Sequence, residues 1–146
     1  MSDLFQQEYI NYKWDPWTYK SGGFSSLKKA SPAIPPKYGV YIIRAPHEIN
    51  RTKGASNIIY IGQSGGGVRK GKQGIGTGNS SRGRIFNTRG KDKIIREMIE
   101  SLYLNKGFII ECYFTMPDED PKKIEGILLE LYVKTYYELP PANHQF

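Results

Sequence analysis

The chain has 146 residues, 38% of them hydrophobic and 24% charged, and its formal net charge is +7. This composition is typical of a folded globular domain and excludes a disordered chain or a membrane protein as the class. The positive charge indicates a polyanionic partner such as a nucleic acid.

The cysteine count and the distribution of apolar residues indicate the cellular compartment in which the protein works. Cys112 is the only cysteine, which excludes an internal disulfide and a zinc site built from cysteines. The sequence has neither a membrane-length apolar run nor an apolar leader at its start. We therefore expect a cytoplasmic protein with no membrane partner.

Residues 1–37 are rich in aromatic side chains but show no sustained helical or strand period. The stretches SGGFSS and SPAIPP interrupt any regular element. We predict an irregular arm that covers the core of a domain formed by residues 38–146 or contacts a second subunit. Wedging between DNA bases is the alternative role for its aromatic residues.

Two β-rich runs follow the arm. YGVYIIR occupies residues 38–44 and NIIYIG occupies residues 57–62, with the polar stretch APHEINRTKGAS between them. This order predicts an antiparallel hairpin with a long loop. Strand geometry would then place the phenols of Tyr41 and Tyr60 side by side.

Residues 63–83 lose the hydrophobic pattern and contain eight glycines, four basic residues and no acid. Such a segment cannot build a core by itself, and we predict a basic loop. The absence of acids favours a segment that follows DNA phosphates, and a plain connector is the alternative.

The second half of the chain contains two helical patterns and one strand. Residues 91–104 carry apolar residues at helical spacing, FIIECYFTM at 108–116 is a third β-rich run, and a second helix is predicted from Lys122 to about Tyr137. The order predicts an α+β fold with a small mixed or antiparallel sheet of about three strands flanked by helices.

Several residues have side chains suited to phosphodiester hydrolysis. A tyrosine, an arginine and a carboxylate supply a base, a charge clamp and a metal ligand. The chain offers Tyr41 and Tyr60, the arginines Arg82, Arg84 and Arg89, and Glu125 for these parts. The phenol has an ordinary pKa near 10 and needs a nearby cation to act near neutral pH. Gly39 and Gly62 would allow a backbone or a phosphate to approach closely.

These residues occur in an order that resembles the GIY-YIG endonuclease superfamily. Gly39-Val40-Tyr41 and Tyr60-Ile61-Gly62 resemble the paired signature, followed by Arg84-Ile85, by Glu125 in EGILLELY and by PPAN at 140–143. The resemblance covers residues 38–143. An isolated domain with a long loop after YIG is most similar to the small restriction enzymes of that superfamily.

The resemblance implies a role for each matched position. Tyr41 would be the general base, and Tyr60 would hold the attacking water and the phosphate. Arg84 would stabilise the developing charge, and Asn143 would brace the site. Glu125 would bind one divalent ion, Mg²⁺, for which Mn²⁺ can substitute; Mg²⁺ keeps most of its waters, so one carboxylate is chemically adequate.

Two positions depart from the family pattern. Thr88 stands where many members carry a histidine or tyrosine that contacts the catalytic tyrosine. A cation would then activate Tyr41, with Lys70, Lys72 and Lys91 as open alternatives. Glu130 is the reserve metal ligand, but it cannot share a helix face with Glu125, because five residues turn a helix by about 140°.

DNA is the expected partner, double-stranded in the restriction-type interpretation, together with a second copy of the chain and a companion DNA methyltransferase. A nicking nuclease of repair, recombination or homing and a non-cleaving nucleic-acid-binding module are the alternatives. We expect contacts to DNA phosphates from seven basic residues, Arg69, Lys70, Lys72, Arg82, Arg89, Lys91 and Lys93.

Overall fold

One antiparallel sheet of four strands organises the chain. The computed structural model describes residues 3–14, 17–23, 25–35, 37–64, 85–86 and 90–144. The strand order is β1-β4-β2-β3. The strands are β1 (Trp17–Ser21), β2 (Gly39–Asn50), β3 (Ala55–Ser64) and β4 (Phe108–Phe114). The predicted α+β class is confirmed.

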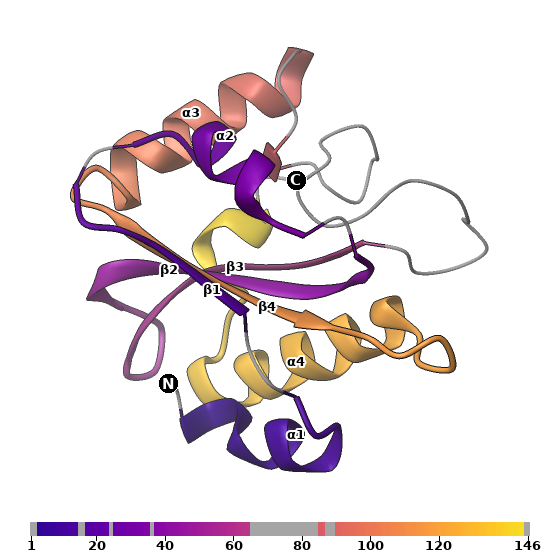
Figure 1. The fold of residues 1–146 in the computed structure, drawn as a ribbon. Helices are drawn as coiled ribbons and strands as arrows, with labels where there is room; N and C mark the ends of the chain where they lie inside the picture. Colours follow the sequence, from indigo (N-terminus) through magenta and orange to yellow (C-terminus); the bar gives the residue numbers. More distant parts are fainter. Residues whose placement is uncertain are drawn as a thin grey trace.

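Helices cover both faces of the sheet. Figure 1 shows α2 and α3 above the sheet and α1 and α4 below it. The helices are α1 (Gln6–Asn11), α2 (Leu27–Ala30), α3 (Gly90–Tyr103) and α4 (Pro121–Tyr136), with the short 3₁₀ turns η1 (Asp3–Phe5), η2 (Ser31–Ala33) and η4 (Pro141–His144). None of the helices in the described ranges is long and apolar enough to cross a membrane.

The central strand β2 separates two hydrophobic cores. Tyr41 and Ile43 pack in the core under α2 and α3, whereas Val40 and Ile42 pack in the core over α1 and α4. Alternate residues of a strand point to opposite faces, and both faces of this strand are covered. Consequently the buried first part of β2, Val40 to Ile43, appears in the sequence as a continuous apolar run.

The hairpin between β2 and β3 is longer than predicted, and its loop is shorter. Most of the polar stretch 45–56, expected to be a long loop, is strand, because β2 continues to Asn50 and β3 begins at Ala55. Asn50 pairs with Ala55, and register shifts occur between Ile43 and Arg44 and between Arg44 and Ile49. Beyond Ala45, β2 is mostly exposed. This part of the strand therefore forms from polar residues and shows no alternation of apolar and polar positions.

The arm is not irregular throughout, and this changes the expected strand number. Residues 17–21 form β1, which pairs antiparallel with β4 from Trp17↔Cys112 to Ser21↔Phe108. Its half-buried and exposed residues alternate, as expected for an edge strand. A run of five residues gives a weak local signal, and its partner strand supplies the missing stabilisation.

The two long helices lie where their patterns predicted them. Pro121 begins α4 after Asp120, whose side chain accepts a hydrogen bond from the Lys122 N–H at 3.1 Å. Tyr137 ends it in the left-handed conformation, with φ 62°. Because Asp120 caps the helix at this point, Glu125 lies in the second turn of α4.

Candidate active site

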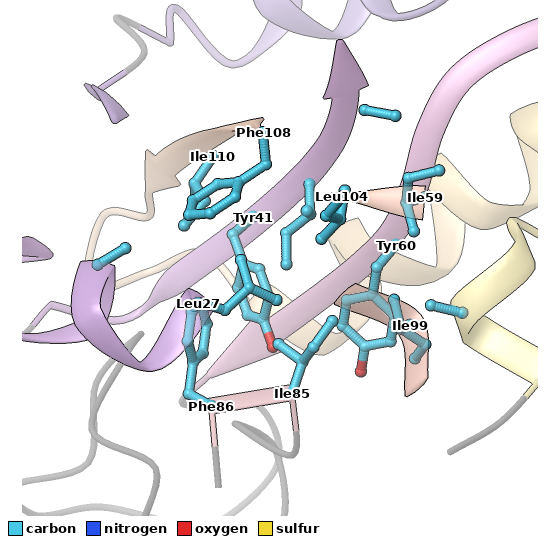
Figure 2. Packing of buried hydrophobic residues seen from close by; sticks show 14 of the residues in the cluster. Leu27, Tyr41, Ile59, Tyr60, Ile85, Phe86, Ile99, Leu104, Phe108 and Ile110 are labelled. Atoms are coloured by element: carbon cyan, nitrogen blue, oxygen red, sulfur yellow. The ribbon is translucent and has the colours of Figure 1, made fainter. Parts of the chain in front are cut away.

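Two tyrosines from neighbouring strands form the centre of the candidate site. The rings of Tyr41 on β2 and Tyr60 on β3 have centroids 5.9 Å apart and an interplanar angle of 37°. Tyr60 lies close enough to Tyr41 to raise the pKa of that phenol. Figure 2 shows both hydroxyls pointing the same way, toward the side where Ile85 and Ile99 lie. The antiparallel pairing of β2 and β3 thus brings two phenols to one place.

Gly62 provides the space in which these rings lie. It is the cross-strand partner of Tyr41. A Cβ atom at Gly62 would lie 2.5 Å from Cζ and 2.6 Å from the hydroxyl oxygen of Tyr41, and 2.7 Å from Cε2 of Tyr60. The close approach that the sequence indicated for a backbone or a phosphate is therefore made by two phenol rings.

Gly39 permits a different close approach. A Cβ atom there would collide with the Tyr113 carbonyl oxygen and would lie 2.9 Å from the Phe114 Cα atom. Gly39 pairs with Phe114 across the β2–β4 boundary. This glycine therefore lets two strand backbones meet at the end of the sheet where Tyr41 lies.

Glu125 lies on α4, which packs on the other face of the sheet from the Tyr41 side chain. Burial raises the pKa of the Glu125 carboxyl to about 7, and Lys122 partly opposes this shift. The Glu125 carboxylate is close enough to Tyr41 to raise the pKa of that phenol. Within the described ranges, no hydrogen bond or ion pair holds this carboxylate.

The reserve carboxylate has a different environment. The Glu130 side chain is 64% exposed and forms an ion pair with Lys134 at 3.0 Å. It is not among the groups that shift the pKa of Tyr41. Of the two glutamates that the sequence left open, Glu125 is the one near the phenols.

Asn143 braces the edge strand between Tyr60 and Gly62. Its Oδ1 atom accepts a hydrogen bond from the Ile61 N–H at 3.0 Å, and its Nδ2 group donates one to the Ile61 carbonyl at 2.9 Å. The side-chain amide therefore satisfies both backbone groups of one residue on the open edge of β3. This geometry gives Asn143 a bracing position beside the phenols.

A second contact fastens the same C-terminal segment, and the sequence pattern gave no sign of it. The Arg51 Nη2 group donates to Glu138 Oε1 at 2.6 Å and to the Leu139 carbonyl at 2.8 Å. The Thr52 hydroxyl donates to Glu138 Oε2 at 2.6 Å. This Arg51–Glu138 clamp joins the β2–β3 turn to the chain after α4, and no local spacing predicts a contact between segments so far apart.

Tyr41 is fully buried, and its pKa is raised well above the ordinary value. Burial is the main cause, followed by the nearby Tyr60, Glu125 and Cys112. The predicted cation that would lower this pKa is not found among the described neighbours. Lys91 is exposed on α3 and is not among the groups that shift the phenol.

Part of the predicted site lies outside the described residues. Lys93 is described, and it forms an ion pair with Glu97 at 2.9 Å. Gln63 and Ser64, expected to begin the loop, are buried residues of β3. The predicted residues beyond the described ranges are Arg69, Lys70, Lys72, Arg82, Arg84, Thr88 and Arg89.

The donor set suits a hard divalent cation. No group of three or more His, Cys, Asp or Glu occurs in the described part of the chain. Mg²⁺ does not need one, because it is commonly held by one or two carboxylates with waters and substrate phosphates. Glu125 is an oxygen donor without a protein partner among the described residues, which fits such an ion.

Comparison with known proteins adds no family assignment. Neither the family models, nor the curated proteins, nor the solved structures contain a significant match to this chain.

Proposed function

We propose that the protein is a divalent-metal-dependent DNA endonuclease that hydrolyses phosphodiester bonds. The observation that carries the proposal is the side-by-side placement of Tyr41 and Tyr60, with Glu125 of a third element close enough to raise the pKa of Tyr41. The resemblance of these positions to the GIY-YIG superfamily supports it. A carboxyl with a strongly shifted pKa near two buried phenols is a feature typical of functional sites, which supports the proposal.

Glu125 is the residue that would hold Mg²⁺. When bound, the ion would neutralise the carboxylate and stabilise the oxygen that leaves the phosphate. The negative charge of Glu125 is one of the causes that raise the Tyr41 pKa. Neutralising that charge would therefore remove one cause of the raised Tyr41 pKa, whereas burial, the largest cause, would remain.

Tyr41 and Tyr60 would act together on the attacking water. Tyr41 would first lose its own proton to solvent and, as the phenolate, would then take a proton from this water. Tyr60, whose ring lies beside that of Tyr41, would orient the water through its hydroxyl. Asn143 keeps the strand that carries Tyr60 in place by its two hydrogen bonds to Ile61. Arg84 would stabilise the charge that develops on the phosphate.

The finer proposal is a restriction-type enzyme that cuts double-stranded DNA. A chain with one such site cuts one strand, so a double-strand break needs two copies. The basic charge of the chain supports a DNA substrate.

A non-cleaving nucleic-acid-binding module is the second candidate. The complete burial of Tyr41 favours it, because a buried neutral phenol is also an ordinary core residue. Under this alternative the fold binds nucleic acid, and Glu125 has no metal to hold.

A plasmid assay separates the two candidates. Supercoiled DNA is incubated with purified protein in Mg²⁺ or Mn²⁺ and in excess chelator, with Glu125→Ala and the matched exposed variant Glu130→Ala in parallel. We expect metal-dependent nicked and linear products from the native chain and from Glu130→Ala, and none from Glu125→Ala. Binding that retards DNA without any cleavage in either metal would favour the binding module. Fixed fragment ends would favour restriction over repair-type nicking.

A further inference from the structure

An apolar stripe lies on the outer face of α3. Ile94, Met98 and Leu102 are 68%, 41% and 61% exposed. Residues four apart lie on one side of a helix, so the three side chains form a continuous row. In Figure 1, α3 lies at the periphery of the ribbon, above the sheet. A row of exposed large apolar side chains commonly marks an interaction surface.

The opposite face of α3 fixes this orientation. Ile99 is fully buried in the core, and the charged side chains of Arg96 and Glu100 are buried beside it. Glu100 Oε2 accepts a hydrogen bond from the Leu27 N–H at 2.6 Å, and its other oxygen lies 3.8 Å from Arg96 Nε. Turning the helix to hide the stripe would break these contacts, so the stripe belongs to the folded state.

We propose that this stripe is the contact between two copies of the chain, related by a two-fold axis that passes beside Met98. The spacing carries the inference, because Ile94 and Leu102 lie four residues before and after Met98. In an antiparallel pair of α3 helices, Met98 then meets Met98 of the second copy, and Ile94 meets its Leu102. Such a self-complementary contact is the usual form of a homodimer interface.

The charges on α3 favour a second copy over other occupants. The helix carries three basic residues and three acidic ones, so its net charge is zero, whereas the chain carries +7. Two strongly positive molecules repel each other least when they meet through surfaces whose own net charge is zero. A neutral apolar face is also a poor surface for DNA phosphates. The basic residues are Lys91, Lys93 and Arg96, and the acidic ones are Asp92, Glu97 and Glu100.

The size of the stripe predicts a weak dimer that DNA strengthens. Three side chains on a helix of 14 residues form an interface well below the standard of about 1,600 Å². We expect dissociation constants in the micromolar range for the free protein. Two copies bound to one duplex would associate more strongly, and this part of the inference rests on the proposed function.

Disulfide trapping tests the two-fold geometry. Met98→Cys is oxidised in the full chain at micromolar concentration, with Lys123→Cys, at an exposed position of α4, as the matched control. The native Cys112 is buried and does not compete. We expect a covalent dimer from Met98→Cys and a monomer from Lys123→Cys. Ile94→Cys should cross-link weakly alone and strongly when mixed with Leu102→Cys.

Sedimentation velocity with Met98→Lys completes the test. This variant places two like charges at the axis and should lower self-association at least tenfold without changing the fold. The inference is overturned if Met98→Cys stays monomeric on oxidation, or if Met98→Lys associates as the native chain does. A stripe covered by residues 65–84 of the same chain would give both of those results. Dimerisation without DNA cleavage would support this interface while refuting the proposed function, so the two can fail separately.

Discussion

At the residue scale, the carboxyl of Glu125 on α4 has an unusual environment. Burial raises the pKa of its carboxyl to about 7, and none of the described residues pairs with it. An acid in the first turns of an exposed helix would ordinarily stay ionised at neutral pH. The folded chain thus bears a free-energy cost when Glu125 is charged, and metal binding would remove this cost.

Replacing Glu125 by Gln should stabilise the metal-free protein at alkaline pH. The folded-state pKa is raised from 4.5 to about 7, so the stability linked to the protonated form is complete below pH 4.5 and is lost as pH rises through 7. Glutamine mimics the protonated form at every pH. In chemical denaturation, the variant should match the native chain near pH 4.5 and exceed it by up to about 3 kcal/mol at pH 8.

The exposed Glu130→Gln variant is the control for that measurement, because its carboxylate lies in solvent beside Lys134. It should show no comparable dependence on pH. Equal pH profiles for Glu125→Gln and the native chain would refute the desolvation of Glu125.

The space above Gly62 predicts a second residue-scale effect. A methyl group at Gly62 would lie within 2.7 Å of both phenol rings, whereas one at Gly126 of α4 would meet nothing within 4 Å. We expect Gly62→Ala to lower the free energy of unfolding by roughly 1–3 kcal/mol. Gly126→Ala should raise it by up to about 1 kcal/mol, because alanine favours the helix. Thermal and denaturant unfolding of both variants measure the difference, and a Gly62→Ala protein as stable as the native chain would contradict the packing.

At the element scale, the sequence predicted the strands that are buried on both faces and both long helices. The apolar runs of β2, β3 and β4 show strong local patterns because both of their faces are covered. The edge strand β1 was not predicted, since it is half exposed and is stabilised by β4, far along the chain. The ends of the β2–β3 hairpin were also missed, because polar residues there pair in the exposed part of the sheet.

The same distinction applies to the candidate site. Tyr41, Tyr60 and Glu125 could be identified because they belong to an ordered series of short motifs. The Arg51–Glu138 clamp could not, because an ion pair between a turn and a C-terminal segment has no periodic signature. Arg51 and Glu138 come together only because the folded chain places the β2–β3 turn next to the segment after α4.

The clamp gives the element-scale prediction. Glu138 accepts hydrogen bonds from Arg51 and Thr52, and it holds the segment that ends in Asn143. Glu138→Ala should lower the free energy of unfolding by about 1–3 kcal/mol, because it leaves the Arg51 guanidinium without its carboxylate. Glu48→Ala, at an exposed position of β2, should change it by less than about 0.5 kcal/mol. If the two variants have the same free energy of unfolding, the Arg51–Glu138 clamp does not stabilise the fold.

At the scale of the whole molecule, the arm contributes to both cores, because Leu27 and Ala30 lie in the core above the sheet. Phe5 and Tyr9 pack with Val40, Ile42 and α4 below the sheet. Tyr9 and Trp14 stack on Tyr113, with ring centroids 5.0 and 4.8 Å away. The arm is therefore expected to unfold together with the sheet and not before it.

A truncation in the arm tests this cooperativity. Phe5 is fully buried, and Phe5→Ala should lower the global free energy of unfolding by roughly 3–5 kcal/mol, in a single transition. Ile10 on α1 is 59% exposed, and Ile10→Ala should have a small effect. An early separate transition for the arm, followed by native-like unfolding of the sheet, would show that the arm is independent.

The central claim is that Glu125 and the two phenols form a catalytic site, and single-turnover cleavage of duplex DNA in Mg²⁺ tests it most directly. We predict that Tyr41→Phe and Glu125→Gln each slow cleavage at least about 100-fold while remaining folded, because each removes a group that acts in the reaction. Glu130→Gln should stay within about twofold of the native rate, since its side chain is exposed. Native-like rates for Tyr41→Phe or Glu125→Gln, or no cleavage by the native chain, would contradict the claim.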